Sequence, residues 1–504
     1  MSLQPCSASR DDAAVTLPDF SPIDALDDTI LVKLKARLAA VGLTAGAIEP
    51  ILGAARGVHP LLRRPVLHHH LRALAEPYAY AARALMFGDP IEHAELRQTF
   101  GELAAPLVAS GLIREVGAGF VSPFTMSVVD GLFCIADLLE HAGEAVMGLG
   151  PLTIPLCAAV KPAGALGKAL DLGCGAGVVA LLLARRTVSV IATDINPRAV
   201  AMTRFNARFN GVSNVDVRLG SLFEPVARDR FDLVASQPPF IPQSDDARSG
   251  DFMSGGKLGD ELVLSLLDAL PDHLVPGGRA VIVAEWGHGP RHAAPGERVK
   301  KQLPNVPADV MLFEYAPVRM EVHAAEYSAA LHPTLGDAYE REATRRLNHG
   351  VTMGIDELVP SLVVLRRVDD RRPRFEVLRG NTIATANSRR LDAMLLAREA
   401  VRSIDSLLDS IVCLPEGATS FDMGSSVRLE LAPEAMLGPI EVTSELMALY
   451  ARFSPPATVR AAIDRHLAAG ASTESPQALA KQVAHALLNG HLEVQPRTLI
   501  IAPG

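Results

Sequence analysis

The chain has 504 residues, too many for one hydrophobic core, and this length predicts about three domains. Apolar residues make up 49% and charged residues 21%, as in an ordinary globular protein, and no uninterrupted apolar stretch suits a membrane helix. A net charge of −9 argues against a surface built mainly for nucleic-acid phosphate. These properties favour a small-molecule or protein substrate and no membrane partner.

The N-terminus and the cysteines indicate a compartment. The first fifteen residues have no basic patch followed by an apolar core, so they do not form a signal peptide and we expect a cytoplasmic protein. The five cysteines are scattered without a CxxC pair and are expected to be reduced thiols: Cys6, Cys134, Cys157, Cys174 and Cys413.

Residues 1–145 are expected to form an N-terminal domain that is mostly helical, because apolar residues recur there at helical spacing. Residues 94–124 have the outline of a winged helix, but its second helix, PLVASGL, has no Arg or Lys to read bases. We expect this module to pack or to cover a substrate. His68, His69 and His70 are adjacent on one helix and point in different directions, so a helix surface is expected rather than a metal site.

Residues 146–368 alternate short β-branched runs with helical runs, the pattern of an α/β fold with a mostly parallel sheet. The last two strands frame a helical insertion at 326–350, and the pattern suits an antiparallel final strand. We predict a seven-stranded, Rossmann-like sheet with strands at 167–173, 188–194, 215–221, 231–237, 279–285, 309–315 and 361–368.

A C-terminal accessory domain, residues 369–504, follows the charged hinge DDRRPR. Helical spacing recurs at about 391–413 and 455–489, and the ending SPQALAKQVAHALLNGHLEVQP, residues 475–496, suggests another small helical or winged-helix unit. Nothing in this domain has the spacing of metal ligands or of a nucleophile.

The strongest chemical signal is the run ALDLGCGAGVVALLLARR. A buried strand brings Asp171 to its end, and Gly173, Gly175 and Gly177 then form a tight turn before an apolar helix. The run is GxGxG without the third glycine of GxGxxG, and the chain has no GxxxxGK[ST] sequence. The acid and this spacing favour S-adenosylmethionine, whose cationic amino-acid part Asp171 can approach directly or through water.

The next two strand ends offer further cofactor contacts. Asp194 lies 23 residues after Asp171 and can accept hydrogen bonds from both ribose hydroxyls, although it can also cap the helix that follows Asn196 and Pro197. After the third strand, Ser221 and Phe223 are placed to contact adenine, although a buried Leu-Phe pair is as often part of a core.

The segment FDLVASQPPFIP predicts the site of the methyl acceptor. A strand ends at Ser236, and the loop Gln237-Pro238-Pro239-Phe240 follows at the carboxyl edge, where open α/β sheets bind ligands. Two prolines stiffen the loop, so the Gln237 amide and the Pro238 carbonyl can hold an NH₂ group with its lone pair aimed at the methyl. A rigid turn without function is the alternative interpretation.

The order DLGCGAG, ATDINPRAV, GSLFEP, FDLVASQPPF and LVPGGRAVIVAEW resembles the class I methyltransferases related to the release-factor glutamine methyltransferase and the small-domain rRNA methyltransferases. The resemblance implies that S-adenosylmethionine binds at the glycine turn and the acidic strand ends, and that Gln237 to Phe240 hold the acceptor nitrogen. That family has Asn, Asp or Ser before the two prolines, whereas this chain has the longer Gln237. The expected cofactor residues are Asp171, Gly173, Gly175, Gly177, Asp194, Asn196, Ser221 and Phe223.

Several functions fit these residues. Methylation of a nitrogen on a small molecule such as an amino acid is the first expectation, because the chain is acidic and its flanking domains resemble covers. The alternatives are methylation of protein glutamine or rRNA, S-methylation of a thioether amino acid, and a non-catalytic regulator that senses the cofactor; a dehydrogenase fits less well. Lys257 and Asp260 lie near the expected entrance of the substrate site. They are expected either to contact the substrate or to form a loop and the start of a helix.

Overall fold

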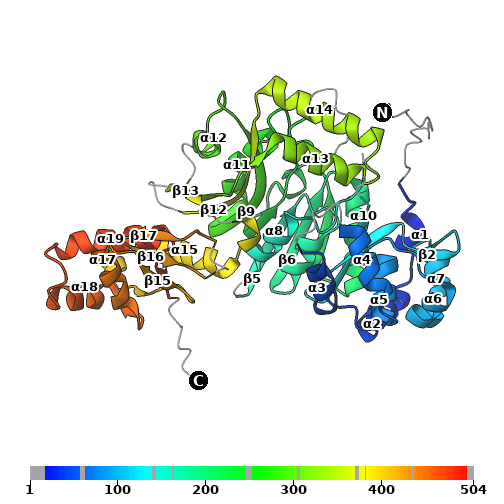
Figure 1. The fold of residues 1–504 in the computed structure, drawn as a ribbon, viewed down its shortest axis with the longest axis horizontal. Coiled ribbons are helices and arrows are strands. Elements are labelled where there is room, and N and C mark those ends of the chain that lie inside the picture. The colour runs from blue at the N-terminus through cyan, green and yellow to red at the C-terminus, as the bar shows by residue number, and fades with distance from the viewer. Residues whose placement is uncertain are drawn as a thin grey trace, which may run out of the picture.

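A computed structural model describes residues 17–56, 63–138, 144–161, 164–243, 253–303, 307–368, 374–380, 382–432 and 436–495. The expectations for the first fifteen residues, including Cys6, and for hinge positions 369–373 lie outside these ranges. An N-terminal group of helices and a C-terminal group lie on opposite sides of a central α/β layer (Figure 1). Within the described ranges, no helix has the length and apolarity to span a membrane.

The central sheet has nine strands, in the order β13-β10-β12-β9-β8-β5-β6-β7, with β11 paired to β12. The seven predicted strands are all present: β5 (Leu166–Leu172), β6 (Thr187–Asp194), β7 (Val215–Leu219), β8 (Phe231–Ser236), β9 (Leu274–His288), β10 (Ala308–Glu314) and β12 (Glu357–Arg367). Strands β5 to β9 are parallel, and β12 runs antiparallel to both β9 and β10, as predicted.

The predicted count of seven strands was too low by two. β11 (Val318–Arg319) has only two residues, and β13 (Phe375–Arg379) follows the charged hinge and pairs in parallel with β10. Neither strand carries a long apolar run that would distinguish it from a loop. The sheet therefore continues past Val368.

Successive side chains along each strand point to opposite faces of the sheet, so two apolar cores form, one on each face. Ala169, Leu233 and Val281 point to one face, against the helices α8 (Thr153–Val160), α9 (Val178–Ala184), α10 (Pro197–Asn210) and α15 (Ser388–Ala400). Leu170 and Val234 point to the other face, against α11 (Glu261–Ala269) and α12 (Pro295–Gln302). Because both faces are covered, the strands are apolar throughout.

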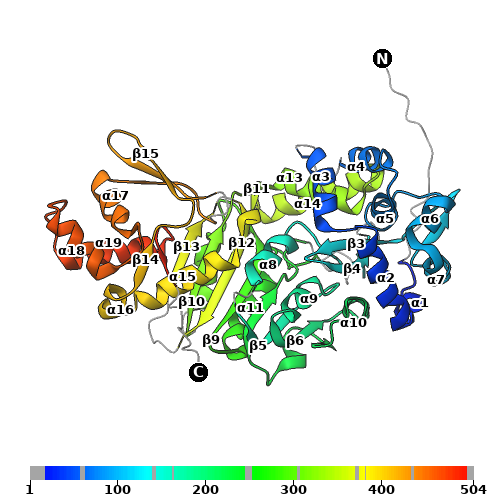
Figure 2. The same cartoon turned by 90° about the horizontal axis from the view of Figure 1, so that it is seen from below.

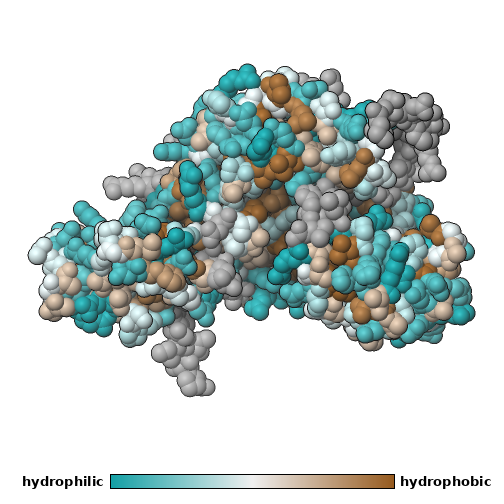
Figure 3. All heavy atoms as spheres, viewed as in Figure 1, coloured by the Kyte–Doolittle hydropathy of each residue, from teal (hydrophilic) through white to brown (hydrophobic). Residues whose placement is uncertain are grey.

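The helical insertion predicted between the last two strands forms α13 (Met320–Leu331) and α14 (Asp337–Met353). These two helices pack on each other beside the sheet (Figures 1 and 2). The surface in Figure 3 is mixed, with apolar side chains gathered over the central part. Val322 and Val351 of the insertion are exposed.

The N-terminal part shares its core with α10. Met202, Phe205 and Phe209 of α10 pack among apolar side chains of the N-terminal helices. Asn206 of α10 exchanges hydrogen bonds of 2.9 Å with the N–H and the carbonyl of Ile135. The elements of this part are α1 (Ser21–Asp24), α2 (Asp28–Ala40), α3 (Ala45–Ala54), α4 (Arg63–Arg72), α5 (Pro77–Leu85), α6 (His93–Phe100), α7 (Ala104–Ala109), β1 (Arg114–Val116), β2 (Gly119–Val121), β3 (Phe124–Val129) and β4 (Leu132–Asp137).

Neither flank is purely helical. The N-terminal part contains two hairpins, and the C-terminal part contains two three-stranded sheets beside its helices. Beyond α15, the C-terminal part has its own core, built around residues such as Tyr450 and Phe453. Its elements are α16 (Ile404–Leu408), β14 (Ile411–Cys413), β15 (Thr419–Asp422), β16 (Val427–Glu430), β17 (Ile440–Val442), α17 (Ser444–Tyr450), β18 (Ala457–Thr458), α18 (Val459–Ala468), α19 (Pro476–Leu488) and β19 (Glu493–Val494).

Candidate active site

The glycine turn joins β5 to α9 as predicted. Gly173, Gly175 and Gly177 have φ angles of 75°, 52° and 81°, in the left-handed region that suits glycine. A Cβ on Gly177 would lie 2.6 Å from Cγ2 of Thr203, so this glycine also lets α9 approach α10. A Cβ on Gly173 would meet nothing within 4 Å, so the described structure leaves open space in front of the turn.

Asp194, at the end of β6, fixes the glycine turn. Its Oδ2 accepts a hydrogen bond of 2.9 Å from the N–H of Gly175, and its Oδ1 accepts one of 2.9 Å from the N–H of Asn196. Burial raises the pKa of Asp194, against the lowering effect of these backbone hydrogen bonds. Each carboxylate oxygen keeps a second acceptor direction, so a pair of ribose hydroxyls fits this carboxylate.

Asp171, at the end of β5, is only 2% exposed, and its Oδ2 accepts a hydrogen bond of 2.8 Å from the N–H of Ala180 in α9. Burial raises the pKa of Asp171 to about 7; the Ala180 hydrogen bond lowers it and the neighbouring charge of Asp194 raises it. A cation bound here would stabilise the charged form of this carboxyl.

The segment VMGLGPLT, residues 146–153, for which no site residue was predicted, lies against the glycine turn. The carbonyl of Met147 accepts a hydrogen bond of 3.3 Å from the N–H of Ala176, and a Cβ on Gly175 would lie 3.0 Å from this carbonyl. The segment then leads into α8, whose first residue is Thr153. The hydroxyl of Thr153 donates a hydrogen bond of 2.8 Å to Oε1 of Gln237.

The Thr153 contact links the segment that lies against the glycine turn to the predicted acceptor loop. Gln237 is half-buried at the carboxyl end of β8, and Pro238 and Phe240 are buried. Glycines pack against the loop from the far side, because a Cβ on Gly259 would lie 2.2 Å from the carbonyl oxygen of Phe240. The only sequence signal for Thr153 was its place at the start of an apolar helical run after GLGPL.

Three predicted cofactor residues also have contacts with the rest of the fold. The Oδ1 of Asn196 accepts a hydrogen bond of 2.9 Å from the N–H of Arg198 and caps α10, and its Nδ2 donates to the carbonyl of Glu144. The ring of Phe223 stacks on His273 with centroids 4.2 Å apart, so this side chain packs in the core. Ser221 is half-buried in the turn after β7.

Two further candidates have structural partners. Asp260 is buried and pairs with Arg298, which also donates to the carbonyl of Gly287, so this carboxylate holds α12 against the sheet. Burial raises the pKa of Asp260, and the charge of Arg298 opposes that shift. Lys257 is exposed, and its carbonyl accepts a hydrogen bond of 2.8 Å from Nε2 of His349 in α14.

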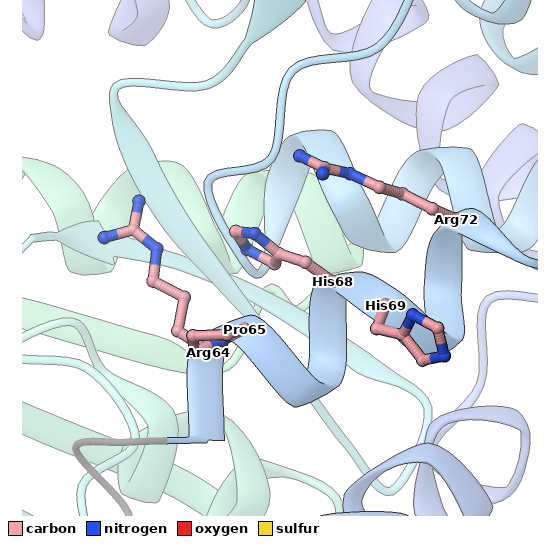
Figure 4. A pocket seen from close by; sticks show the side chains of 5 residues that line it. All are labelled: Arg64, Pro65, His68, His69 and Arg72. Carbon is pink, nitrogen blue, oxygen red and sulfur yellow. The ribbon is translucent and has the colours of Figure 1, made fainter.

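The three histidines of α4 do not gather at one point, although the rings of His69 and His70 lie edge to face with centroids 5.5 Å apart. His68 and His69 point in different directions beside Arg64 and Arg72 (Figure 4), and Nε2 of His68 lies 2.9 Å from the carbonyl of Phe87. Among the residues that the structure describes, no group of His, Cys, Asp and Glu is arranged to hold a metal ion.

Comparisons with known proteins cover the central part of the chain. The family model "Methyltransferase small domain" matches residues 156–294. The release factor glutamine methyltransferase of Geobacter sulfurreducens is 35% identical over 22% of this chain and 42% of that protein. That of Yersinia pestis is 39% identical over 24% of this chain and 46% of its own length. The putative protein N5-glutamine methyltransferase of Methanocaldococcus jannaschii is 32% identical over 22% of this chain and 57% of its own length.

The chain thus spans about half the length of the curated relatives it matches. The matched segment holds the glycine turn, the two acidic strand ends and the acceptor loop, in the order that the sequence predicted. Residues 156–294 thus match the small-domain methyltransferase model and are similar to glutamine methyltransferases of the class I S-adenosylmethionine-dependent superfamily.

Proposed function

We propose that this chain transfers a methyl group from S-adenosylmethionine to the side-chain amide nitrogen of a glutamine in a protein. The observation that supports the proposal is the hydrogen bond from Thr153 to Gln237, which links the predicted acceptor loop to the segment whose Met147 carbonyl contacts the glycine turn. A cofactor at the glycine turn and an acceptor at the loop would then lie at one edge of the sheet.

The loop has the chemistry to hold an amide NH₂ group. S-adenosylmethionine supplies an electrophilic methyl group on a positively charged sulfur. The amide oxygen of Gln237 uses one acceptor direction for Thr153 and keeps a second for an acceptor N–H, and the carbonyl of Pro238 is a second candidate. Two prolines limit the motion of both groups, and such positioning contributes several kcal/mol to transfer reactions.

The relatives favour protein glutamine over the free amino acid that the acidic composition suggested, because their names specify glutamine in release factors or in proteins. Gln237 departs from the family pattern by one methylene. The hydroxyl of Thr153 holds the longer side chain by its amide oxygen, which offsets that extra length.

The first experiment is calorimetric titration of the protein with S-adenosylmethionine and S-adenosylhomocysteine, with NADH as a control. Labelled S-adenosylmethionine is then supplied with a bacterial release factor, with total cell protein and with free amino acids, and mass spectrometry identifies the methylated atom. We expect methylated glutamine in protein. Absence of cofactor binding, or methylation of other groups alone, would reject the proposal.

Substitutions at Gln237 and Thr153 distinguish residues that bind the cofactor from residues that position the methyl acceptor. Gln237→Ala and Thr153→Val are expected to keep the affinity for S-adenosylmethionine and to lower turnover by about tenfold or more, because both disturb only the positioning of the acceptor. The exposed Thr419→Val, in the C-terminal part, is the matched control. Equal losses of affinity and turnover in Gln237→Ala would contradict this division of roles.

A further inference from the structure

A buried carboxylate and a histidine form a pair near the acceptor loop. Glu285 lies near the end of β9 and His323 lies on α13, with Nε2 of His323 3.1 Å from Oε2 of Glu285. The two residues are 6% and 2% exposed. Among the residues that the structure describes, Nδ1 of His323 is buried and has no hydrogen-bond partner.

The register of the sheet places Glu285 on the acceptor side. β8 and β9 are parallel and pair Ser236 with Ile282, so Gln237 comes level with Val283 and Glu285 lies two residues further on. At about 3.3 Å per residue, this offset is about 7 Å along the neighbouring strand. Val283 of β9 and Ala235 of β8 belong to the same core, and Glu285, two residues after Val283 in β9, continues that face of the sheet.

The insertion α13–α14 closes this side of the site. His349 of α14 contacts the carbonyl of Lys257, in the segment that follows the acceptor loop. Leu258, in the same segment, packs against the apolar cluster of Met320 and Ala324 on α13. A Cβ on Gly287 would lie 2.8 Å from the carbonyl of Leu258, so the end of β9 touches that segment too.

We propose that Glu285 is the carboxylate that binds the N–H of the methyl acceptor, with His323 as its positioning residue; this inference rests on the proposed function. The nitrogen lone pair forms the bond to the methyl carbon while the carbon–sulfur bond breaks and its electrons stay on sulfur. The nitrogen then carries an extra proton, which passes to the Glu285 carboxylate and from there to water. His323 donates its Nε2–H to Oε2 and keeps the carboxylate oriented.

The surroundings of the pair leave Glu285 as the proton acceptor. The ring of Tyr327 lies 4.4 Å from that of His323, and the guanidinium of Arg346 lies 6.0 Å from the Tyr327 ring. Burial raises the pKa of Tyr327 well above its usual value, and the charge of Glu285 adds to that shift, so this phenol stays neutral. The pair therefore suits an acceptor nitrogen that bears hydrogen, an amide or an amine, and offers nothing to a thioether sulfur.

The test compares Glu285→Gln, Glu285→Asp and His323→Gln with the matched control Glu321→Gln, an exposed residue on the same helix as His323. The measurements are kcat and KM for methyl transfer to the release factor or to the acceptor that the methylation survey identifies. Calorimetric affinity for S-adenosylmethionine and the thermal midpoint are measured in parallel. Glu285→Gln should lower kcat by about 100-fold with unchanged cofactor affinity.

We expect Glu285→Asp to recover part of this loss, because it keeps a carboxylate, and His323→Gln to give an intermediate kcat. If Glu285→Gln does not fold, the kcat values of Glu285→Asp and His323→Gln test the role of Glu285. A wild-type kcat in a folded Glu285→Gln protein would overturn the role of Glu285. A wild-type kcat in both Glu285→Asp and His323→Gln, or an S-methylated product, would overturn it as well. A nitrogen acceptor other than glutamine that still depends on Glu285 would reject the proposed function and leave this inference standing.

Discussion

Binding of S-adenosylmethionine should tighten as pH rises towards 7, because Asp171 must lose its proton to receive the cationic cofactor. Burial raises the pKa of this carboxyl from 3.8 to about 7 in the free protein. The cofactor binds the charged form better, so cofactor binding should lower that pKa and release a proton. The perturbation to test is Asp171→Asn, which removes the titration and keeps the side-chain size.

The magnitude follows from the fraction of protein with ionised Asp171. That fraction falls about tenfold for each pH unit below 7, so the apparent affinity should be about 100-fold weaker at pH 5 than on its plateau above pH 7. The same shift affects folding in a defined direction. Because the folded pKa lies above the unfolded one, the contribution of Asp171 to stability is fully present below pH 3.8 and is lost as pH rises to about 7.

The assay is calorimetric titration with S-adenosylmethionine at several pH values, in two buffers with different ionisation enthalpies so that released protons are counted. We expect the wild type to release close to one proton per cofactor at pH 6, and Asp171→Asn to bind more weakly with a flatter pH profile. The comparison between the two proteins removes any titration of the cofactor itself. Parallel pH profiles with equal proton release would refute this account of Asp171.

Two further predictions concern the glycine turn. Asp194→Ala should weaken cofactor binding by about 1–3 kcal/mol and also lower the thermal midpoint, because it removes the carboxylate that accepts hydrogen bonds from the N–H groups of Gly175 and Asn196. Calorimetry measures the first effect and thermal unfolding the second. Unchanged affinity for the cofactor would contradict the role of Asp194. Gly177→Ala should destabilise the fold by about 2–4 kcal/mol in chemical denaturation, because alanine is strained at a φ of 81° and its Cβ would lie 2.6 Å from Thr203. A loss of stability below about 1 kcal/mol would mean that the turn relaxes around the new side chain.

The sequence was sufficient to predict seven of the nine strands of the sheet, because the apolar runs of those seven are long and each ends in a turn signal. Position alone did not separate roles at the strand ends. Asn196 and Phe223 are predicted at the cofactor, and in the structure Asn196 also caps α10 and Phe223 also stacks on His273. The local sequence pattern predicts that a residue lies at the carboxyl edge of the sheet, but it does not predict which residue from another element its side chain contacts.

Contacts between distant segments were not visible in the sequence. Thr153 and Gln237 are 84 positions apart, and Glu285 and His323 are 38 apart, so no local spacing connects them. The predicted helical insertion began at residue 326, whereas α13 begins at Met320, so His323 lay outside the predicted helix. His323 therefore carried no sequence signal of its own.

The residues outside the family match bear on which acceptor this chain takes. The matched segment, residues 156–294, contains the glycine turn, both acidic strand ends, Gln237 and Glu285. Thr153 precedes that segment and His323 follows it, and each contacts one of the two acceptor-side residues inside it. The predicted cofactor residues thus lie inside the matched segment, whereas the two side chains that contact Gln237 and Glu285 come from outside it.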